Sequence, residues 1–437
     1  MRPAFRSIAW LVFLVLFLDV QGARAETKQP RIITLEQAYD MAFASDQSIQ
    51  IAAIEIRKAN LLPWSALTRL GPRLTGNMSY DRSQRTIVGG ITQRSDSESR
   101  NADLSLRQTL VDFTVPPAYQ FGKLSALVAR LQYRQIIRQV LFGVAQAYYN
   151  VLKDRSLVGI NQQTLDLSSQ QLDLAQTRYD YGAAARLDIS RAKATLEGAR
   201  LVLIQSQNTL AVDRNTLGNI LNLGGDTGFV LVEPPGAAVS EEPFLSVLSQ
   251  AYVHREDFKI AKLAIEQDTA LRNEVVGQYA PTVAASAGQT WNSPTGSLNS
   301  RAWDANIAVQ MPFLTGGQRE IDLRDANHQI SESRLQLETT AKTIQQEVKT
   351  AWLAVKALQE AIQASKAQVD ANVQNYNDVE SQYQTGAATS LDVQVALRDL
   401  NNSRTVLSGQ TYDYQVALRD LQRVQGKFQE ERIEKAK

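Results

Sequence analysis

Apolar residues recur at the spacing of one helical face through a very long stretch in the first half of the chain. The stretch runs from about Val115 to Tyr179, and only Pro116 and Pro117, at its start, interrupt its helical character. Its apolar stripe consists of Leu124, Leu127, Leu131, Leu141, Val144 and Tyr148. At 1.5 Å per residue, roughly sixty-five residues would span about 100 Å. A helix of this length indicates a coiled coil rather than a globular domain.

A helix of about half that length is predicted on each side of the long one. The letters TLEQ from Thr34 have the form of a capping box, and the helical pattern then continues to about Leu70. The helix after the long one covers about Leu187–Leu223, and the second half opens with a similar helix at about Phe244–Tyr279. Laid end to end, the two short helices would flank the long one along its whole length.

Between the opening helix and the long helix of each half, the pattern changes to strict alternation. The predicted strand pairs cover 73–82 with 100–111, and 282–292 with 302–313. The first strand places Leu74, Gly76, Met78 and Tyr80 on one face. The last strand alternates in the same way, whereas Gln289 interrupts the apolar face of the strand before it. Period two over about nine residues predicts strands with one apolar and one polar face.

Strands of this kind fit either a soluble sandwich or an outer-membrane barrel with its apolar face toward lipid. Their predicted length of about nine to eleven residues is what a tilted strand needs to cross a bilayer. Tyr80, Trp291 and Trp303 lie near predicted strand ends and would suit an aromatic belt at the membrane surface. The alternation by itself does not decide between the two structures.

The N-terminus favours export and therefore the barrel. Arg2 and Arg6 supply the positively charged region that begins a signal peptide. The apolar run that follows, Ile8–Leu18, is about eleven residues long and too short to span a bilayer. The letters ARA at 23–25 form a signal-peptidase pattern, so the mature chain is predicted to begin at Glu26. The alternative is an uncleaved membrane anchor. No later run reaches about eighteen apolar residues, so no further transmembrane helix is expected.

Composition argues against several other classes of protein. The chain has 46 basic and 45 acidic residues, so charge gives no reason to expect a nucleic-acid partner. It has no cysteine, which excludes disulfides and lipid attachment to an N-terminal cysteine. Its two histidines, His254 and His328, lack metal-ligand spacing, and no phosphate loop or nucleophile elbow is present. We therefore expect no enzymatic activity and no cofactor.

One glycine-centred turn occurs twice, as YGAAARLD at 181–188 and TGAATSLD at 385–392. Gly182 and Gly386 are 204 positions apart (386 − 182). Each lies at the predicted end of a long helix, where a left-handed residue is favoured. AYYNV at 147–151 matches AWLAV at 351–355 at the same offset, so the two halves share one plan. The small residues around both glycines would suit docking of another protein's helices, and the alternative is two ordinary helical hairpins.

At these turns the chain resembles the TolC family of outer-membrane efflux and type I secretion channels. RYDYGAAARLDISRAKATLEGAR (178–200) and QYQTGAATSLDVQVALRDLNNSR (382–404) are each similar to the family pattern Y-x-x-G-x-x-x-x-L-D-V. TLEQAYDMAFASD (34–46) and QMPFLTGGQR (310–319) also resemble family phrases, and the resemblance covers nearly all of the mature chain. It implies a homotrimer in which four strands per chain close a twelve-stranded barrel and the helices form a periplasmic tunnel.

The resemblance also implies function: a passive exit duct in the outer membrane of a Gram-negative bacterium, supplied by an inner-membrane pump and a periplasmic adaptor (a membrane fusion protein). The implied adaptor-docking residues are Gly182, Ala185, Gly386 and Thr389. The implied residues of the periplasmic aperture are Asp188, Tyr383 and Asp392. The chain departs from some members at Ala388, where they have Arg, and at Val395, where they have a second acid. Two stacked carboxylate rings are therefore not expected.

The expected fold is mixed α and β: an outer-membrane β-barrel, four strands per chain, continuous with a long periplasmic α-helical coiled-coil barrel and built from two internal structural repeats. Its parts are a signal peptide (1–25), a first repeat (26–222) with a tip turn at 180–187, a linker or equatorial region (223–243), a second repeat (244–427) with a tip turn at 384–391, and a tail (428–437). The linker and tail are expected to form a belt around the helical barrel. The alternative is a periplasmic coiled-coil adaptor or structural protein without a pore, which would leave the strand pairs unexplained.

Overall fold

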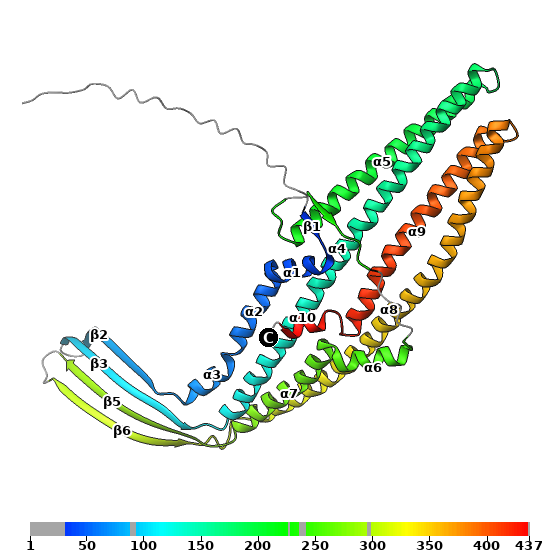
Figure 1. Cartoon of the computed structure of the whole chain (residues 1–437). Helices are drawn as coiled ribbons and strands as arrows, with labels where there is room; N and C mark the ends of the chain where they lie inside the picture. The colour runs from blue at the N-terminus through cyan, green and yellow to red at the C-terminus, as the bar shows by residue number, and fades with distance from the viewer. Residues whose placement is uncertain (1–30, 88–92, 226–227, 236–241, 295–298, 436–437) are drawn as a thin grey trace, which may run out of the picture.

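The chain is elongated, with a β-sheet at one end and two helical hairpins at the other (Figure 1). The structure is a computed structural model that describes residues 31–87, 93–225, 228–235, 242–294 and 299–435. The predicted signal peptide, 1–25, lies outside the described residues.

The predicted strand pairs are present and join into one antiparallel sheet. The strands are β2 (Arg73–Ile87), β3 (Gln93–Val111), β5 (Thr282–Pro294) and β6 (Ser300–Gln310), in the order β2-β3-β5-β6. At 15 and 19 residues, β2 and β3 are longer than predicted, whereas β6 ends before the predicted 311–313. The ladder of β2 and β3 continues beyond the alternating segment because backbone hydrogen bonds hold it, and these do not depend on side-chain polarity.

Each pair of strands leads into a very long helix, as predicted. These helices are α4 (Val115–Asp180) and α8 (Gln318–Thr385), of 66 and 68 residues. Two helices of 35 residues, α5 (Arg186–Ile220) and α9 (Ser390–Val424), return along them. At 1.5 Å per residue each long helix extends about 100 Å.

The opening segments are not the continuous helices that the pattern predicted. They consist of α1 (Leu35–Ser45), α2 (Gln47–Ala59), α3 (Leu62–Leu67) and the 3₁₀ turn η1 (Thr68–Leu70) in the first half, and α6 (Phe244–His254) and α7 (Glu256–Gly277) in the second. Asp46 has extended backbone and its carboxylate accepts hydrogen bonds from the Ser48 and Ile49 amides, so it caps a new helix. Arg255 makes the corresponding break between α6 and α7.

The capping box at the first helix is confirmed. Thr34 Oγ1 accepts from the Gln37 amide at 3.3 Å, and Gln37 Oε1 accepts from the Thr34 amide at 3.0 Å. The predicted flanking of the long helix is also observed, because α1, α2 and α3 contact one part of α4 and α5 runs along the remainder (Figure 1).

The connection between halves and the C-terminal segment meet beside the middle of α4. The strand β1 (Arg31–Ile33) pairs in parallel with β4 (Phe229–Leu231) of the connection. The Tyr148 hydroxyl lies 3.0 Å from the Ile33 carbonyl oxygen and 2.5 Å from that of Val232. The terminal helix α10 (Glu430–Lys435) adds an ion pair of 2.9 Å between Arg432 and Glu36. Described parts of the linker and the tail, which were predicted to form a belt, therefore lie close together in one chain.

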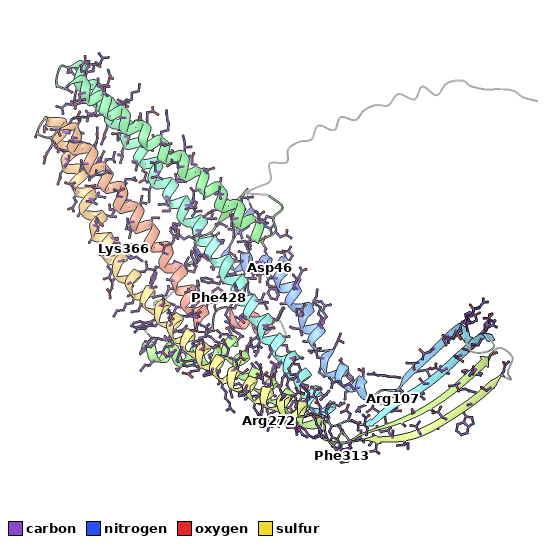
Figure 2. The ribbon with its side chains drawn as sticks, turned by 180° about the vertical axis from the view of Figure 1, so that it is seen from behind. Asp46, Arg107, Arg272, Phe313, Lys366 and Phe428 are labelled. Carbon is purple, nitrogen blue, oxygen red and sulfur yellow. The ribbon has the colours of Figure 1, made fainter. Side chains whose placement is uncertain are left out.

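A buried ion pair joins three parts of this middle region. Arg138 of α4 is 5% exposed and Glu256 of α7 is 6% exposed, and Arg138 Nη2 lies 2.7 Å from Glu256 Oε1. Arg138 Nη1 also donates to the Phe428 carbonyl oxygen at 2.8 Å. Phe428 is itself buried against Tyr39 and lies at the centre of the helical part in Figure 2. One guanidinium thus connects both halves and the C-terminal segment.

Replacing Arg138 with Ala is expected to lower the free energy of unfolding by about 3–5 kcal/mol, because Glu256 would remain buried without its partner. Thermal unfolding of the purified protein in detergent measures the loss. Lys153→Ala is the matched control, since the Lys153–Asp413 pair is much more exposed and should be worth about 0–1 kcal/mol. Similar losses in both variants would contradict the structural role of the buried pair.

Candidate functional site at the sheet faces and the helical tips

The register of the sheet separates an apolar face from a polar face. Residues paired directly across a ladder lie on the same side of a sheet, and the next pair lies on the other side. One row across the four strands is Leu74, Leu106, Ala287 and Ala305. The adjacent row, on the opposite side, is Arg73, Arg107, Ser286 and Asn306. The alternation predicted from the sequence is therefore confirmed, and it is continuous across both strand pairs.

The apolar face is uncovered in the single chain. Trp303 is 79% exposed, and Leu74, Ile307 and Val309 are exposed as well. Large contiguous apolar surfaces on proteins mark contacts with other proteins or with membranes. The face therefore requires a partner that a single chain does not supply.

The three predicted belt aromatics all lie on this face. Trp303 pairs with Gln289, Trp291 with Ala102, and Tyr80 with Arg100, which are successive rows of the same side. Trp291 and Trp303 lie three residues from an end of β5 and β6 (294 − 291 and 303 − 300), as predicted. Tyr80 does not, because it is the eighth residue of the fifteen in β2.

Beyond the Tyr80 row the same face becomes charged. The next paired residues are Arg82 and Glu98, which form an ion pair of 3.7 Å. From Val283 to Trp291 the apolar rows cover nine residues of β5, which is eight steps (291 − 283) or about 27 Å along the strand. This agrees with the nine to eleven or so residues that a tilted strand needs to cross a bilayer.

The opposite edge of the apolar band has aromatic residues that sequence reasoning missed. Phe313 is 84% exposed and lies at the junction of sheet and helices (Figure 2), and Phe113 is also exposed. Both follow the last residue of a strand, β3 or β6, by two or three positions. The sequence feature that could have identified them is an aromatic residue just after an alternating segment.

Both tip glycines have the predicted left-handed backbone. The φ angles are +68° at Gly182 and +86° at Gly386, and each glycine follows directly on the end of a long helix or its cap. A Cβ added at Gly182 would meet nothing within 4 Å. At this position the requirement for glycine is conformational and is not imposed by neighbouring atoms.

The residues that begin the return helices are exposed and differ in chemistry. Thr389 caps α9, because its Oγ1 accepts from the Asp392 amide at 3.3 Å while Asp392 Oδ2 accepts from the Thr389 amide at 2.8 Å. Ala185 holds the same place before α5 but has no side-chain acceptor, and its own amide donates to Asp188 Oδ2 at 3.3 Å. Hydrogen bonds from the Thr389 hydroxyl and amide hold the pKa of Asp392 below its usual value.

Two of the three predicted aperture residues meet between the hairpins. The Ser390 hydroxyl at the start of α9 donates to the Asp188 carboxylate of α5. Tyr383 is only 5% exposed, and burial, followed by the negative charge of Asp188, raises the pKa of its phenol. Asp392 differs, because it is exposed and its carboxylate is engaged by Thr389.

Arg178 is the tip residue that sequence reasoning missed. Its guanidinium carbon lies 4.5 Å from the centroid of the Tyr383 ring, and its Nη2 is 3.4 Å from the Ala183 carbonyl oxygen to which it donates. Arg178 therefore links the first turn to the second hairpin. Comparison of the two halves could not identify it, because the residue 204 positions later (382 − 178) is Gln382.

Metal chemistry and helical membrane spans find no support in the part of the chain that the structure describes. No group of three or more His, Cys, Asp or Glu side chains there could hold a metal ion. Among the same residues, every helix is too polar or too short to cross a bilayer. His254 lies with Nδ1 3.2 Å from Glu430 Oε1, and this contact belongs to the packing of the C-terminal segment.

Comparison with known proteins gives a consistent result. The family model described as "Outer membrane efflux protein" matches residues 38–223 and 247–427. The "Probable efflux pump outer membrane protein TtgC" of Pseudomonas putida is 25% identical over 400 residues, 86% of this chain and 79% of that protein. The "Alkaline protease secretion protein AprF" of Pseudomonas aeruginosa is 23% identical over 435 residues, 93% of this chain and 86% of that protein.

The fold is also that of solved channels. The crystal structure of the Campylobacter jejuni CmeC outer membrane channel superposes with a TM-score of 0.77 at 16% identity, covering 92% of this chain and 88% of that one. The resemblance to the TolC family noted at the turns is thus confirmed by a match that extends over most of both halves. The chain belongs to the outer membrane efflux protein family.

Proposed function

We propose that three copies of this chain form a passive exit duct that crosses the outer membrane of a Gram-negative bacterium and extends into the periplasm. The duct would receive substrates from an inner-membrane pump through a periplasmic adaptor. The family is one of outer-membrane channels, and no catalytic step is assigned to this chain.

The observation that carries the proposal is an amphipathic four-stranded sheet with two open edges. In the described residues β2 and β6 each pair with a single strand. Membrane barrels need at least about eight strands to close, so one chain is too small. Three copies supply twelve strands (4 × 3), the number that the family uses. The apolar face would then contact lipid, and the polar face would line the pore.

The helices support the second part of the proposal, a periplasmic coiled-coil tunnel built from two repeats. Each half contributes a long helix followed by one of 35 residues, which packs along about half of the long helix. Leu201 and Ile204 on α5 and Leu335 on α8 remain exposed in the single chain. We assign such residues to contacts between neighbouring copies, because they would otherwise expose apolar surface to the periplasm.

Delivery of substrate would occur at the tips. The exposed turns at Gly182, Ala185, Gly386 and Thr389 are the surfaces farthest from the sheet (Figure 1), where an adaptor's helices could reach them. The related proteins include one named for an efflux pump and one named for protease secretion. A duct without a specific binding pocket would serve either kind of delivery system.

The contacts at the tip also suggest a periplasmic aperture. Ser390 with Asp188, and Arg178 with Tyr383, hold the two hairpins of one chain against each other. Movement of one hairpin away from the other would have to break both contacts. In this proposal Asp392 stabilises the second turn beside the aperture, through its bonds to Thr389.

A periplasmic adaptor or structural protein without a pore is the alternative function. The uncovered apolar face, with strands long enough to cross a bilayer, argues against it. The deciding experiment is reconstitution of the purified protein into planar lipid bilayers, together with fractionation of cells. A duct should give stepwise ion conductance and remain in the outer-membrane fraction, whereas a protein without a pore would do neither.

Arginine on the apolar face should prevent insertion. Leu104→Arg or Ile307→Arg would cost about 2–4 kcal/mol if the site lies near the bilayer midplane, and trimers in the outer-membrane fraction should fall sharply. Ser105→Arg and Asn306→Arg are the matched controls, since each adjoins one of these residues but lies on the polar face. Equal damage on both faces would indicate a soluble sandwich.

Bulky side chains at the tips should abolish export without affecting assembly. Ala185→Trp combined with Thr389→Trp is expected to prevent adaptor docking, because both positions are exposed. Cell sensitivity to the exported compounds and in vivo cross-linking to the adaptor measure the effect. Replacing Gly182 or Gly386 with Ala is the control for the turn itself, which should cost about 1 kcal/mol and leave trimers intact. Normal export by the double Trp variant would contradict a role of these turns in adaptor docking.

Loss of the contacts between hairpins should open the aperture. Arg178→Ala combined with Asp188→Ala removes both contacts at the tip, so conductance in planar bilayers should rise severalfold. Arg200→Ala is the control, because Arg200 lies on α5 and, among the described residues, pairs with Glu197 of the same helix, at 3.3 Å. Unchanged conductance in the double variant would show that closure depends on other residues.

A further inference from the structure

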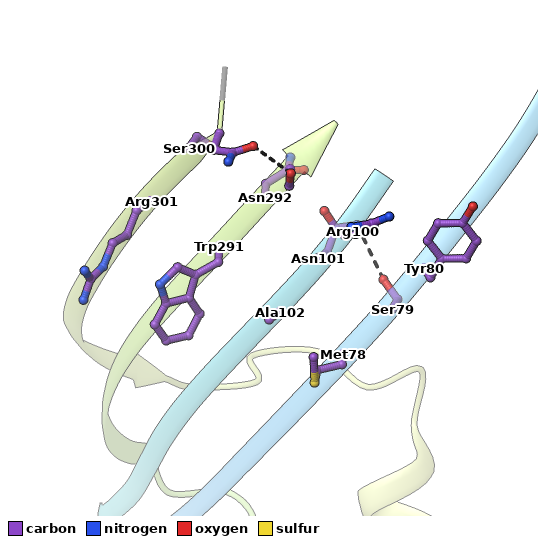
Figure 3. A pocket seen from close by; sticks show the side chains of 12 residues that line it. Met78, Ser79, Tyr80, Arg100, Asn101, Ala102, Trp291, Asn292, Ser300 and Arg301 are labelled. Carbon is purple, nitrogen blue, oxygen red and sulfur yellow. Dashed lines mark hydrogen bonds between the residues drawn. The ribbon is translucent and has the colours of Figure 1, made fainter. Parts of the chain in front are cut away.

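The outer end of the apolar face has an open hollow of about 700 Å³ in which aromatic and basic side chains alternate. Figure 3 shows Tyr80 and Arg100 on the neighbouring strands β2 and β3, and Trp291 and Arg301 on β5 and β6. Tyr80 is paired directly with Arg100 and Trp291 directly with Arg301, so all four belong to the apolar face. Two arginines thus lie at the boundary of the surface that we assign to lipid.

Each arginine stands close to the aromatic ring that it is paired with. The guanidinium carbon of Arg100 is 5.9 Å from the centroid of the Tyr80 ring, and that of Arg301 is 5.7 Å from the centroid of the Trp291 ring. These distances allow cation–π attraction, which orients a guanidinium and leaves its N–H groups free to donate. The aromatic rings therefore hold the cations at the surface without neutralising them.

Gln289, which interrupts the apolar pattern, is accounted for by Arg301. When the amide is oriented with its oxygen toward β6, Gln289 accepts hydrogen bonds from the Arg301 guanidinium, including one from Nη2 at 3.0 Å. The amide is neutral, so it positions the guanidinium and leaves its charge unbalanced. Gln289 therefore lies on a lipid-facing row because its amide positions the Arg301 guanidinium in the next row.

The charges of Arg100 and Arg301 are not balanced by a carboxylate of any described residue. Neither guanidinium has an ion pair with a carboxylate in the described part of the chain, whereas Arg82, one row farther out, is paired with Glu98. Both side chains are exposed. Ala102 shares the row of Arg301, and the rows below it on the same face contain Leu104 with Trp303 and then Leu106 with Ala305. In a membrane, the surface directly above the acyl chains is occupied by lipid headgroups.

We propose that Arg100 and Arg301, held by Tyr80 and Trp291, bind the phosphate group of an anionic lipid in the outer leaflet. The acyl chains of that lipid would lie along the apolar rows below. Guanidinium groups are suited to this ligand because their forked N–H donors match phosphate oxygens. The inference rests on the proposed insertion of the sheet into the outer membrane, and it adds a site for a specific headgroup chemistry.

The test uses the purified full-length trimer in detergent, with lipid A carrying two phosphates as the probe and native mass spectrometry as the measurement. The variant R100Q/R301Q should bind this lipid on the order of tenfold or more weakly than the wild type, because charge-assisted hydrogen bonds are lost. Dephosphorylated lipid A should bind both proteins equally weakly. Equal binding of phosphorylated lipid A by wild type and variant would overturn the proposal.

The matched control is Arg107→Gln, which removes one positive charge from the polar face of the same sheet. It should bind lipid A as the wild type does, and a loss as large as that of R100Q/R301Q would show that only net charge matters. Inorganic phosphate should not displace the lipid. Strong displacement would overturn the lipid site and indicate a site for free anions. If the double variant fails to assemble, Arg100→Gln alone should assemble and still weaken binding, because the Arg100 guanidinium contacts the Tyr80 ring and has no ion pair in the described part of the chain.

Failure of this inference and failure of the proposed function give different results. A wild-type protein that conducts ions and fractionates with the outer membrane, but binds both forms of lipid A equally, would overturn only the headgroup site. A wild-type protein that neither conducts nor stays in the membrane fraction would overturn both.

Discussion

The unpaired edges of an amphipathic sheet are the constraint on which the rest of this molecule depends. β2 and β6 each present one row of backbone N–H and C=O groups without a partner strand in the described chain. Such groups cost several kcal/mol each in hydrocarbon, so a membrane sheet must close on itself. In the proposed trimer, closure by identical chains would turn the apolar rows outward. The aromatic residues, the charged rows beyond Tyr80 and the exposed arginines would all take their roles from that orientation.

The helical part meets a different constraint, because an isolated helix of about 100 Å gains little stability from its own hydrogen bonds. Packing has to be supplied along the whole length of α4, and one partner of 35 residues cannot do so. Two successive sets of shorter helices therefore share the task, and they meet at mid-length. The buried pair of Arg138 and Glu256 joins both halves to the C-terminal segment there. This region fixes how the two hairpins leave the middle of the molecule.

The tips show how one repeated turn acquires two different environments. Gly182 and Gly386 share the left-handed backbone, but only the second turn has a threonine cap. Arg178 approaches the second hairpin at Tyr383, whereas its counterpart in the other half is Gln382. The two turns therefore share one local geometry, and single residue differences distinguish their surroundings. The asymmetry lies where the two hairpins of one chain contact each other.

Sequence alone determined the features that depend on local spacing: the long helices, the capping box at Thr34, the alternating strands and the left-handed glycines. These follow from backbone geometry and from periodicity along one segment. It misplaced the ends of β2 and missed the break at Asp46, because ladder hydrogen bonds and side-chain caps compete with hydrophobic periodicity. The tertiary structure alone decided which distant residues meet. Arg178 with Tyr383, and Arg301 with Gln289 and Trp291, come from separate elements, and no pattern within one segment encodes their contact.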